Sequence, residues 1–113
     1  MSIRLRLDKP WLPLTAEAAA RLPGQLGVYQ VADAQGAVLY IGQAGARSPF
    51  GLRSELQREL AERGAGCQFR VEVNQQYRTR WFELLMVHQA DHGSLPADNA
   101  KNPPPNLGRL SPA

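Results

Sequence analysis

Glu83 is the residue whose surroundings in the sequence most clearly indicate a chemical role. It lies in the run 81–87, in which the other six residues are all apolar. An isolated buried carboxylate costs several kcal/mol, so Glu83 must be paired with a cation, solvated in a cleft or bound to a metal ion. A surface position, or an ion pair with Arg80, explains Glu83 without any function.

Tyr29 and Tyr40 form a second candidate pair. They lie in two runs typical of β-strands, 27–32 and 37–42, which the turn residues 33–36 connect as a hairpin. With this even loop Tyr29 lies directly opposite Tyr40, so both phenols leave the same face of the sheet. Tyrosine is also common in strands without any chemical role, because its ring packs and its hydroxyl finds a local partner.

Hydrophobic spacing predicts the elements that must position these residues. Leucine recurs every four residues from Leu52 to Leu60, which predicts an amphipathic helix that Gly64 ends. Alternation over 69–73 predicts a third strand, and the pattern over 78–91 predicts a more deeply buried helix. The core order is therefore strand, strand, helix, strand, helix.

The segments outside this core are expected to pack against it or to be irregular. Residues 1–7 alternate arginine with aliphatic side chains, so they form an edge strand or lie extended on the core. Thr15 is expected to cap a short alanine-rich helix. Beyond Pro96 the chain is rich in proline, which disfavours a regular helix or a central strand. The expected divisions are an N-terminal extension over 1–25, a core domain over 26–99 and a proline-rich tail over 100–113.

Composition limits the class of protein. A chain of 113 residues has room for one compact domain. The single cysteine, Cys67, cannot form an internal disulfide, and we find neither an export signal nor the roughly 20 apolar residues of a membrane helix. We therefore expect a cytoplasmic protein with no membrane contact. Eleven of the 13 Lys and Arg residues are arginine and the formal charge is +3, which permits a polyanionic partner.

The two strand runs carry a recognisable motif. GVY at 27–29 and YIG at 40–42 are followed by the leucine-periodic helix, a strand and the helix with Glu83. Over residues 26–99 the chain thereby resembles the GIY-YIG nuclease domain, a family that includes DNA repair nucleases. The resemblance implies an α+β fold with a small three-stranded antiparallel sheet flanked by helices. It also implies a DNA endonuclease that hydrolyses phosphodiester bonds with one divalent cation, Mg²⁺ or Mn²⁺.

The resemblance further implies roles for individual residues. Glu83 would hold the divalent ion, which as a hard cation suits oxygen ligands. Tyr29 and Tyr40 would position the attacking water and contact the phosphate. Asn99 would hydrogen-bond near the phosphate or hold the site together. A guanidinium from the first core helix would stabilise charge on the phosphorus.

The chain departs from the family's pattern in that helix. Glu55 stands at the usual arginine position and Glu59 at the position often taken by histidine. A carboxylate cannot replace a cation that binds phosphate. Arg53, Arg58 or Arg47 would then have to supply the charge. Gln43 stands where many members carry lysine. The expected catalytic residues are Tyr29, Tyr40, Arg53, Glu83 and Asn99, and the expected nucleic-acid contacts are Gln43, Arg47, Arg53 and Arg58.

Two functions therefore stay open. The first is a metal-dependent DNA endonuclease, whose specificity comes from DNA structure, a short loop or a protein partner. The second is a catalytically impaired GIY-YIG scaffold that binds nucleic acid or a protein. A guanidinium within reach of Glu83 and both phenols favours the nuclease, because these groups must share one cation and one phosphate ester. A cleft without such a guanidinium favours the binding module.

Overall fold

A four-stranded antiparallel sheet forms the centre of the computed structural model, which describes residues 6–104. The elements in chain order are β1 (Leu12–Pro13), α1 (Ala16–Ala20), β2 (Gly27–Ala32), β3 (Val38–Ala44), α2 (Gly51–Arg63), β4 (Gln68–Val73), α3 (Tyr77–His92) and α4 (Ala97–Ala100). The strands lie in the order β1-β4-β2-β3. The α+β class is confirmed, with the short β1 added to the three expected strands. No helix within residues 6–104 is long and apolar enough to span a membrane.

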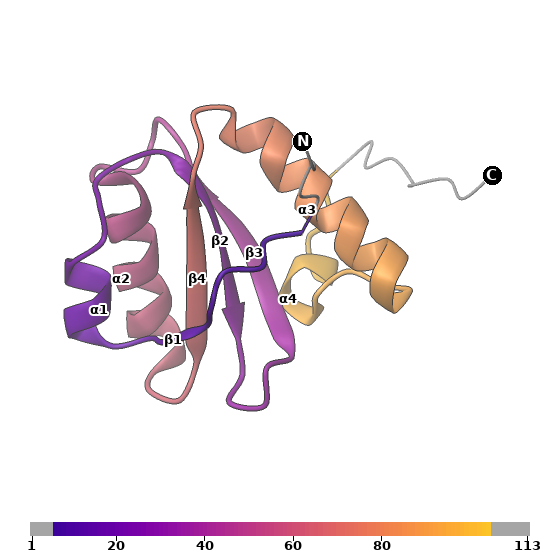
Figure 1. Cartoon of the computed structure of the whole chain (residues 1–113), viewed down its shortest axis with the longest axis horizontal. Coiled ribbons are helices and arrows are strands. Elements are labelled where there is room, and N and C mark those ends of the chain that lie inside the picture. Colours follow the sequence, from indigo (N-terminus) through magenta and orange to yellow (C-terminus); the bar gives the residue numbers. More distant parts are fainter. Residues whose placement is uncertain (1–5, 105–113) are drawn as a thin grey trace.

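The helices cover the two faces of the sheet separately. Figure 1 shows α1 and α2 on one face and α3 on the other. Alternate residues of a strand point to opposite faces. Tyr29 and Val31 of β2 accordingly pack with Leu52 of α2 in one apolar cluster. Val28 of the same strand packs with Leu84 of α3 in a second cluster. A residue's position in its strand therefore decides which helix it meets.

The register of the hairpin differs from the expected one by two residues. Tyr29 pairs with Gly42, and Tyr40 pairs with Val31, so the expectation that the tyrosines lie directly opposite each other is wrong. One residue of the shift arises in the turn, where Ala32 pairs with Val38, and the other arises at a bulge after Val31. A shift of two keeps every side chain on its face. The shared face of the two phenols is therefore confirmed, and their ring centroids lie 6.0 Å apart.

Local signals set the ends of the helices. The Thr15 hydroxyl accepts a hydrogen bond from the Ala18 amide at 3.1 Å and caps α1 as expected. Gly64 ends α2 with φ of +75°, and the left-handed Gly93 ends α3. The expectation of no regular helix beyond Pro96 is wrong, because Pro96 precedes the short α4 and its carbonyl accepts from the Ala100 amide at 2.9 Å.

The N-terminal prediction is only partly covered by the structure. Leu7 is buried against the α3 face but belongs to no strand. The rest of the alternating run, residues 1–5, lies outside the described residues, as does the tail beyond Pro104. A short segment further on, β1, pairs with β4 instead, with Leu12 opposite Phe69.

Candidate nucleic-acid interface

The two phenols lie beside a buried carboxylate instead of an open pocket. Tyr29 is fully buried and donates a hydrogen bond to Oε2 of Glu59 at 2.7 Å. Tyr40 is half-buried, and the Arg63 guanidinium lies over its ring, 5.8 Å from the centroid. Both tyrosines therefore contribute to the packing between the sheet and α2.

Glu59 is the centre of this buried cluster. Glu59 is buried, with 2% of its surface exposed. Its carboxylate accepts a hydrogen bond from Nε of Arg63 at 2.7 Å. Nη2 of Arg58 lies 3.4 Å from the same carboxylate and 3.3 Å from the Tyr29 hydroxyl. Arg63 also reaches Asp98, at 2.7 Å, and so ties α2 to α4. Sequence reasoning treated Glu59 only as a substitute for histidine, although its four-residue spacing from Arg63 was a signal for this ion pair.

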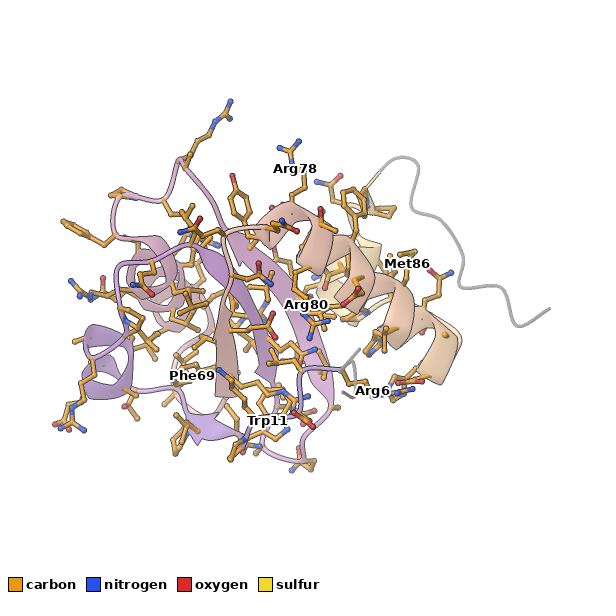
Figure 2. The ribbon with its side chains drawn as sticks, turned by 45° about the horizontal axis from the view of Figure 1, so that its top comes forward. Arg6, Trp11, Phe69, Arg78, Arg80 and Met86 are labelled. Atoms are coloured by element: carbon orange, nitrogen blue, oxygen red, sulfur yellow. The ribbon has the colours of Figure 1, made fainter. Side chains whose placement is uncertain are left out.

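Glu83 lies on the opposite face of the sheet. It accepts a hydrogen bond from Nη1 of Arg80. Nε of Arg80 also donates to Glu72 at 2.8 Å, and Glu72 pairs with Val28 across β4 and β2, on the α3 face. Figure 2 shows Arg80 on α3, next to the sheet. The expectation that Glu83 shares a pocket with the tyrosines is therefore wrong, because α3 and α2 cover different faces.

The donor set does not fit the divalent ion that the resemblance implies. The Glu83 carboxylate is engaged by Arg80, and the phenols that should face it lie across the sheet. Within residues 6–104, no three His, Cys, Asp or Glu side chains gather in a way that could hold a metal ion. The metal role of Glu83 stays a prediction.

Asn99 closes the free edge of β3. Its amide oxygen accepts from the Ile41 amide at 2.8 Å and its Nδ2 donates to the Ile41 carbonyl at 2.9 Å. The Trp81 indole donates to the same carbonyl at 2.8 Å. These bonds satisfy backbone groups that an edge strand would otherwise leave unpaired. Asn99 is itself buried, so it holds the strand in place.

The other expected cations point in different directions. Nε of Arg53 donates to the Leu22 carbonyl at 2.9 Å, toward the end of α1. Arg58 joins the Tyr29–Glu59 cluster and also binds Glu55 at 2.7 Å. Arg47 is exposed in the loop between β3 and α2. The expected nucleic-acid residues therefore do not form one surface, and Arg47 and Gln43 share a groove without Arg53 or Arg58.

That groove lies between the β3–α2 loop and the start of α3. Its volume is about 540 Å³, and its lining includes Gln43, Arg47, Tyr77 and Arg78. Figure 2 shows Arg78 projecting from the first turn of α3. Within residues 6–104, neither Arg47 nor Arg78 has a hydrogen bond or ion pair through its guanidinium. Gly45 allows the Tyr77 ring to lie against the loop, since a Cβ there would be 2.8 Å from the ring.

The one acidic side chain among the described residues that line this groove is already engaged. Glu55 accepts a hydrogen bond from the Ser48 hydroxyl at 2.8 Å and from Nη2 of Arg58 at 2.7 Å. These partners offset its charge, so Glu55 opposes an anion in the groove less than a free carboxylate would. Nothing in the sequence distinguishes Arg78 from any other exposed arginine of a helix, so sequence reasoning missed it.

An aromatic hollow adjoins the groove. It measures about 320 Å³, shares Gln43 and Arg78 with the groove, and is lined further by Trp81, Phe82 and residues 102–104. The Trp81 and Phe82 rings meet edge to face, with centroids 5.2 Å apart. Cationic and aromatic side chains therefore follow one another along this side of the molecule.

Residues 5–91 match the family described as Domain of unknown function (DUF7508). The chain belongs to the DUF7508 family. Searches of curated proteins and of solved structures found no match. The DUF7508 segment contains both walls of the groove and the whole Tyr29–Glu59 cluster apart from Asp98.

The buried phenol makes stability sensitive to alkaline pH. Burial, and then the negative charge of Glu59, raises the pKa of Tyr29 above its usual range, and burial also raises the pKa of Tyr40. Above about pH 10 the unfolded chain loses protons that the folded chain keeps, so stability is complete below that pH and falls above it. Tyr29→Phe should flatten this decline by about 1.4 kcal/mol per pH unit. Urea unfolding between pH 8 and pH 11 measures both slopes, and equal slopes would contradict the assignment.

Proposed function

We propose that this chain binds nucleic acid through the groove between the β3–α2 loop and the start of α3. The observation that carries the proposal is that Arg47 and Arg78 line one groove and that neither guanidinium has a partner among residues 6–104. By contrast, Arg58, Arg63 and Arg80 all bind carboxylates. The planar fork of a guanidinium suits phosphate oxygens, and within the described part of the chain neither of these two is bound to a carboxylate.

The neighbouring hollow supports a preference for single-stranded nucleic acid. Arg78 belongs to both the groove and the hollow, so a phosphate near Arg78 would bring a base close to Trp81 and Phe82. Stacking of a base on an aromatic ring requires that the base be unpaired. A duplex keeps its bases stacked on each other and would use the cationic groove alone.

This proposal takes up the second function expected from the resemblance to the GIY-YIG nuclease domain. The strand, strand, helix, strand, helix order supports a GIY-YIG-like scaffold. The side chains expected to grip a cation and a phosphate instead contact other protein groups, with Tyr29 on Glu59 and Glu83 on Arg80. These contacts favour a binding module over a metal-dependent nuclease.

Fluorescence anisotropy with labelled DNA tests the proposal. We expect the Arg47→Gln/Arg78→Gln variant to bind a single-stranded 20-mer about tenfold more weakly at moderate salt. The dependence of log affinity on log salt should become shallower by about 1.4, because two phosphate contacts are lost. Arg21→Gln is the matched control, since Arg21 is exposed at the end of α1, far in sequence from the groove. A duplex of the same length should bind wild type less tightly than the single strand.

Three outcomes would contradict the proposal. The double variant could bind as tightly as the Arg21→Gln control, or the affinity for DNA could be independent of salt, which would mean that phosphate contacts do not carry the binding. Supercoiled DNA could also be nicked with Mg²⁺ or Mn²⁺ by wild type but not by Glu83→Gln. That last result would favour the metal-dependent endonuclease.

A further inference from the structure

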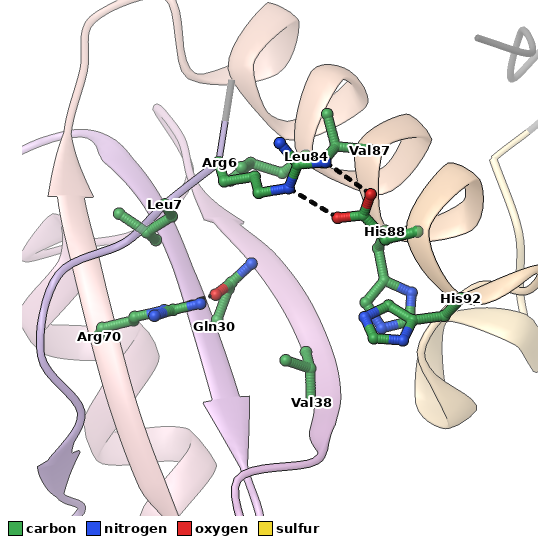
Figure 3. A pocket seen from close by; sticks show the side chains of 10 residues that line it. Arg6, Leu7, Gln30, Val38, Arg70, Leu84, Val87, His88 and His92 are labelled. Atoms are coloured by element: carbon green, nitrogen blue, oxygen red, sulfur yellow. Dashed lines mark hydrogen bonds and ion pairs between the residues drawn. The ribbon is translucent and has the colours of Figure 1, made fainter. Parts of the chain in front are cut away.

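A second hollow lies on the other face of the sheet, beneath α3. Figure 3 shows it between β2, β3 and β4 on one side and α3 on the other. Its volume is about 190 Å³, and Val38, Leu84 and Val87 form an apolar wall. It shares no described lining residue with the groove or the aromatic hollow. A ligand of this hollow would therefore bind independently of the proposed nucleic-acid site.

Gln30 places a side-chain amide in this hollow. The residue lies on the central strand β2 and is 6% exposed. Its Oε1 accepts a hydrogen bond from Nε of Arg70 at 2.7 Å. Because a guanidinium can only donate, this bond determines which end of the amide is oxygen. Nε2 has no hydrogen-bond partner within residues 6–104, and Figure 3 shows the amide nitrogen directed into the hollow.

Arg70 adds a positive charge to this hollow. Its guanidinium lies over the Trp11 ring, 4.0 Å from the centroid, and Nη1 donates to the Lys9 carbonyl at 3.1 Å. Within residues 6–104 it forms no ion pair with a carboxylate. Burial lowers the pKa of Arg70, against the opposing charge of Asp8. A half-buried cation beside a free amide donor that faces the hollow is a setting that an anion stabilises.

The acid that lines this hollow is not available to Arg70. Asp91 accepts two hydrogen bonds from Arg6, at 2.8 and 2.6 Å, and both are drawn in Figure 3. His88 and His92 line the hollow beside Asp91, and the centroids of their two imidazole rings lie 4.4 Å apart. Neither ring adds a negative charge to the lining. The described lining therefore combines polar donors on the sheet with an apolar wall.

We propose that this hollow binds a small organic anion, whose carboxylate accepts from Gln30 and Arg70 and whose apolar part packs on Val38, Leu84 and Val87. The volume suits a single ring with one carboxylate, because a cavity of about 150 Å³ accommodates benzene. An apolar body with one anionic group matches the wall and the donors together.

Titration of the ¹⁵N-labelled full chain with benzoate tests this site by NMR. We expect saturable shifts of the Gln30 side-chain amide and the Arg70 Nε–H. Benzyl alcohol, which has the ring without the charge, should bind at least tenfold more weakly. Inorganic phosphate, which has the charge without the ring, should also bind at least tenfold more weakly. If benzyl alcohol or phosphate bound as tightly as benzoate, the proposal that the ligand uses both the apolar wall and the donors would be overturned.

Two variants and a control separate binding from folding. Gln30→Met keeps a side chain of similar length without the donor and should weaken benzoate binding at least tenfold. Gln57→Met changes an exposed glutamine of α2 and should leave binding unchanged. Should Gln30→Met fail to fold, Val38→Phe fills the hollow from its apolar wall and should abolish the shifts. Absence of saturable shifts in wild type, or wild-type affinity in Gln30→Met or Val38→Phe, would overturn the proposal.

Discussion

Glu59→Ala is expected to lower the free energy of unfolding by about 3–5 kcal/mol. The substitution leaves the buried Tyr29 hydroxyl without its acceptor and removes the carboxylate that binds Arg63 at 2.7 Å. Removal of one partner from a buried charge cluster is more harmful than the loss of an exposed ion pair, because the remaining groups stay desolvated. Urea denaturation at neutral pH, followed by circular dichroism, measures the change.

Glu62→Ala is the matched control for this prediction. Glu62 lies on the same helix, is exposed, and binds Arg58 at 3.2 Å. An exposed ion pair of this kind contributes at most about 0.5 kcal/mol. If both variants lost the same small amount of stability, the buried cluster around Glu59 would not have the role that we assign to it.

Gly42→Ala is the second change with a large expected effect, about 3 kcal/mol of destabilisation. A Cβ at this position would lie 2.2 Å from Cζ of Tyr29, a distance at which something must move. The Tyr29 ring is fully buried and its hydroxyl is held by Glu59, so it cannot move without loss of packing. Thermal or urea unfolding of the single variant gives the magnitude.

A double-mutant cycle identifies the cause of that loss. In a Tyr29→Leu background the ring is absent, so Gly42→Ala should cost less than about 1 kcal/mol. Gly24→Ala serves as the control, because a Cβ there would meet its nearest neighbour, the Phe50 carbonyl, at an ordinary 3.5 Å. The same cost of Gly42→Ala in both backgrounds would show that the ring is not the obstacle.

The close approach of Tyr29 and Gly42 also explains why the YIG run contains a glycine. Gly42 ends the YIG run because the ring of Tyr29 from the GVY run lies on it. Gly27 begins the GVY run where a Cβ would be 2.2 Å from the carbonyl oxygen of Glu72 on β4. The motif residues thus satisfy the packing of three adjacent strands. The presence of these motif residues therefore indicates the fold, but it is weak evidence for catalysis.

Local patterns in the sequence were enough to predict α1, the core strands and helices β2, β3, α2, β4 and α3, and the face of the sheet on which the phenols lie. Leucine spacing and Gly64 defined α2, and Thr15 marked the start of α1. These features were accessible because periodicity, capping and helix termination depend on neighbours within a few residues. The common face of Tyr29 and Tyr40 survived the change of register because a shift of two residues preserves side-chain alternation.

Which side chains meet depended on how the elements pack against one another. The turn and the bulge after Val31 together set the register, and the packing of α2 and α3 on opposite faces separated Glu83 from the phenols. Glu59, noted in the sequence only for the histidine it replaces, became the partner of Tyr29 over a separation of 30 residues. Such contacts depend on the path of the chain between the two residues. Local periodicity carries no information on that path, because the same amphipathic helix can cover either face of a sheet.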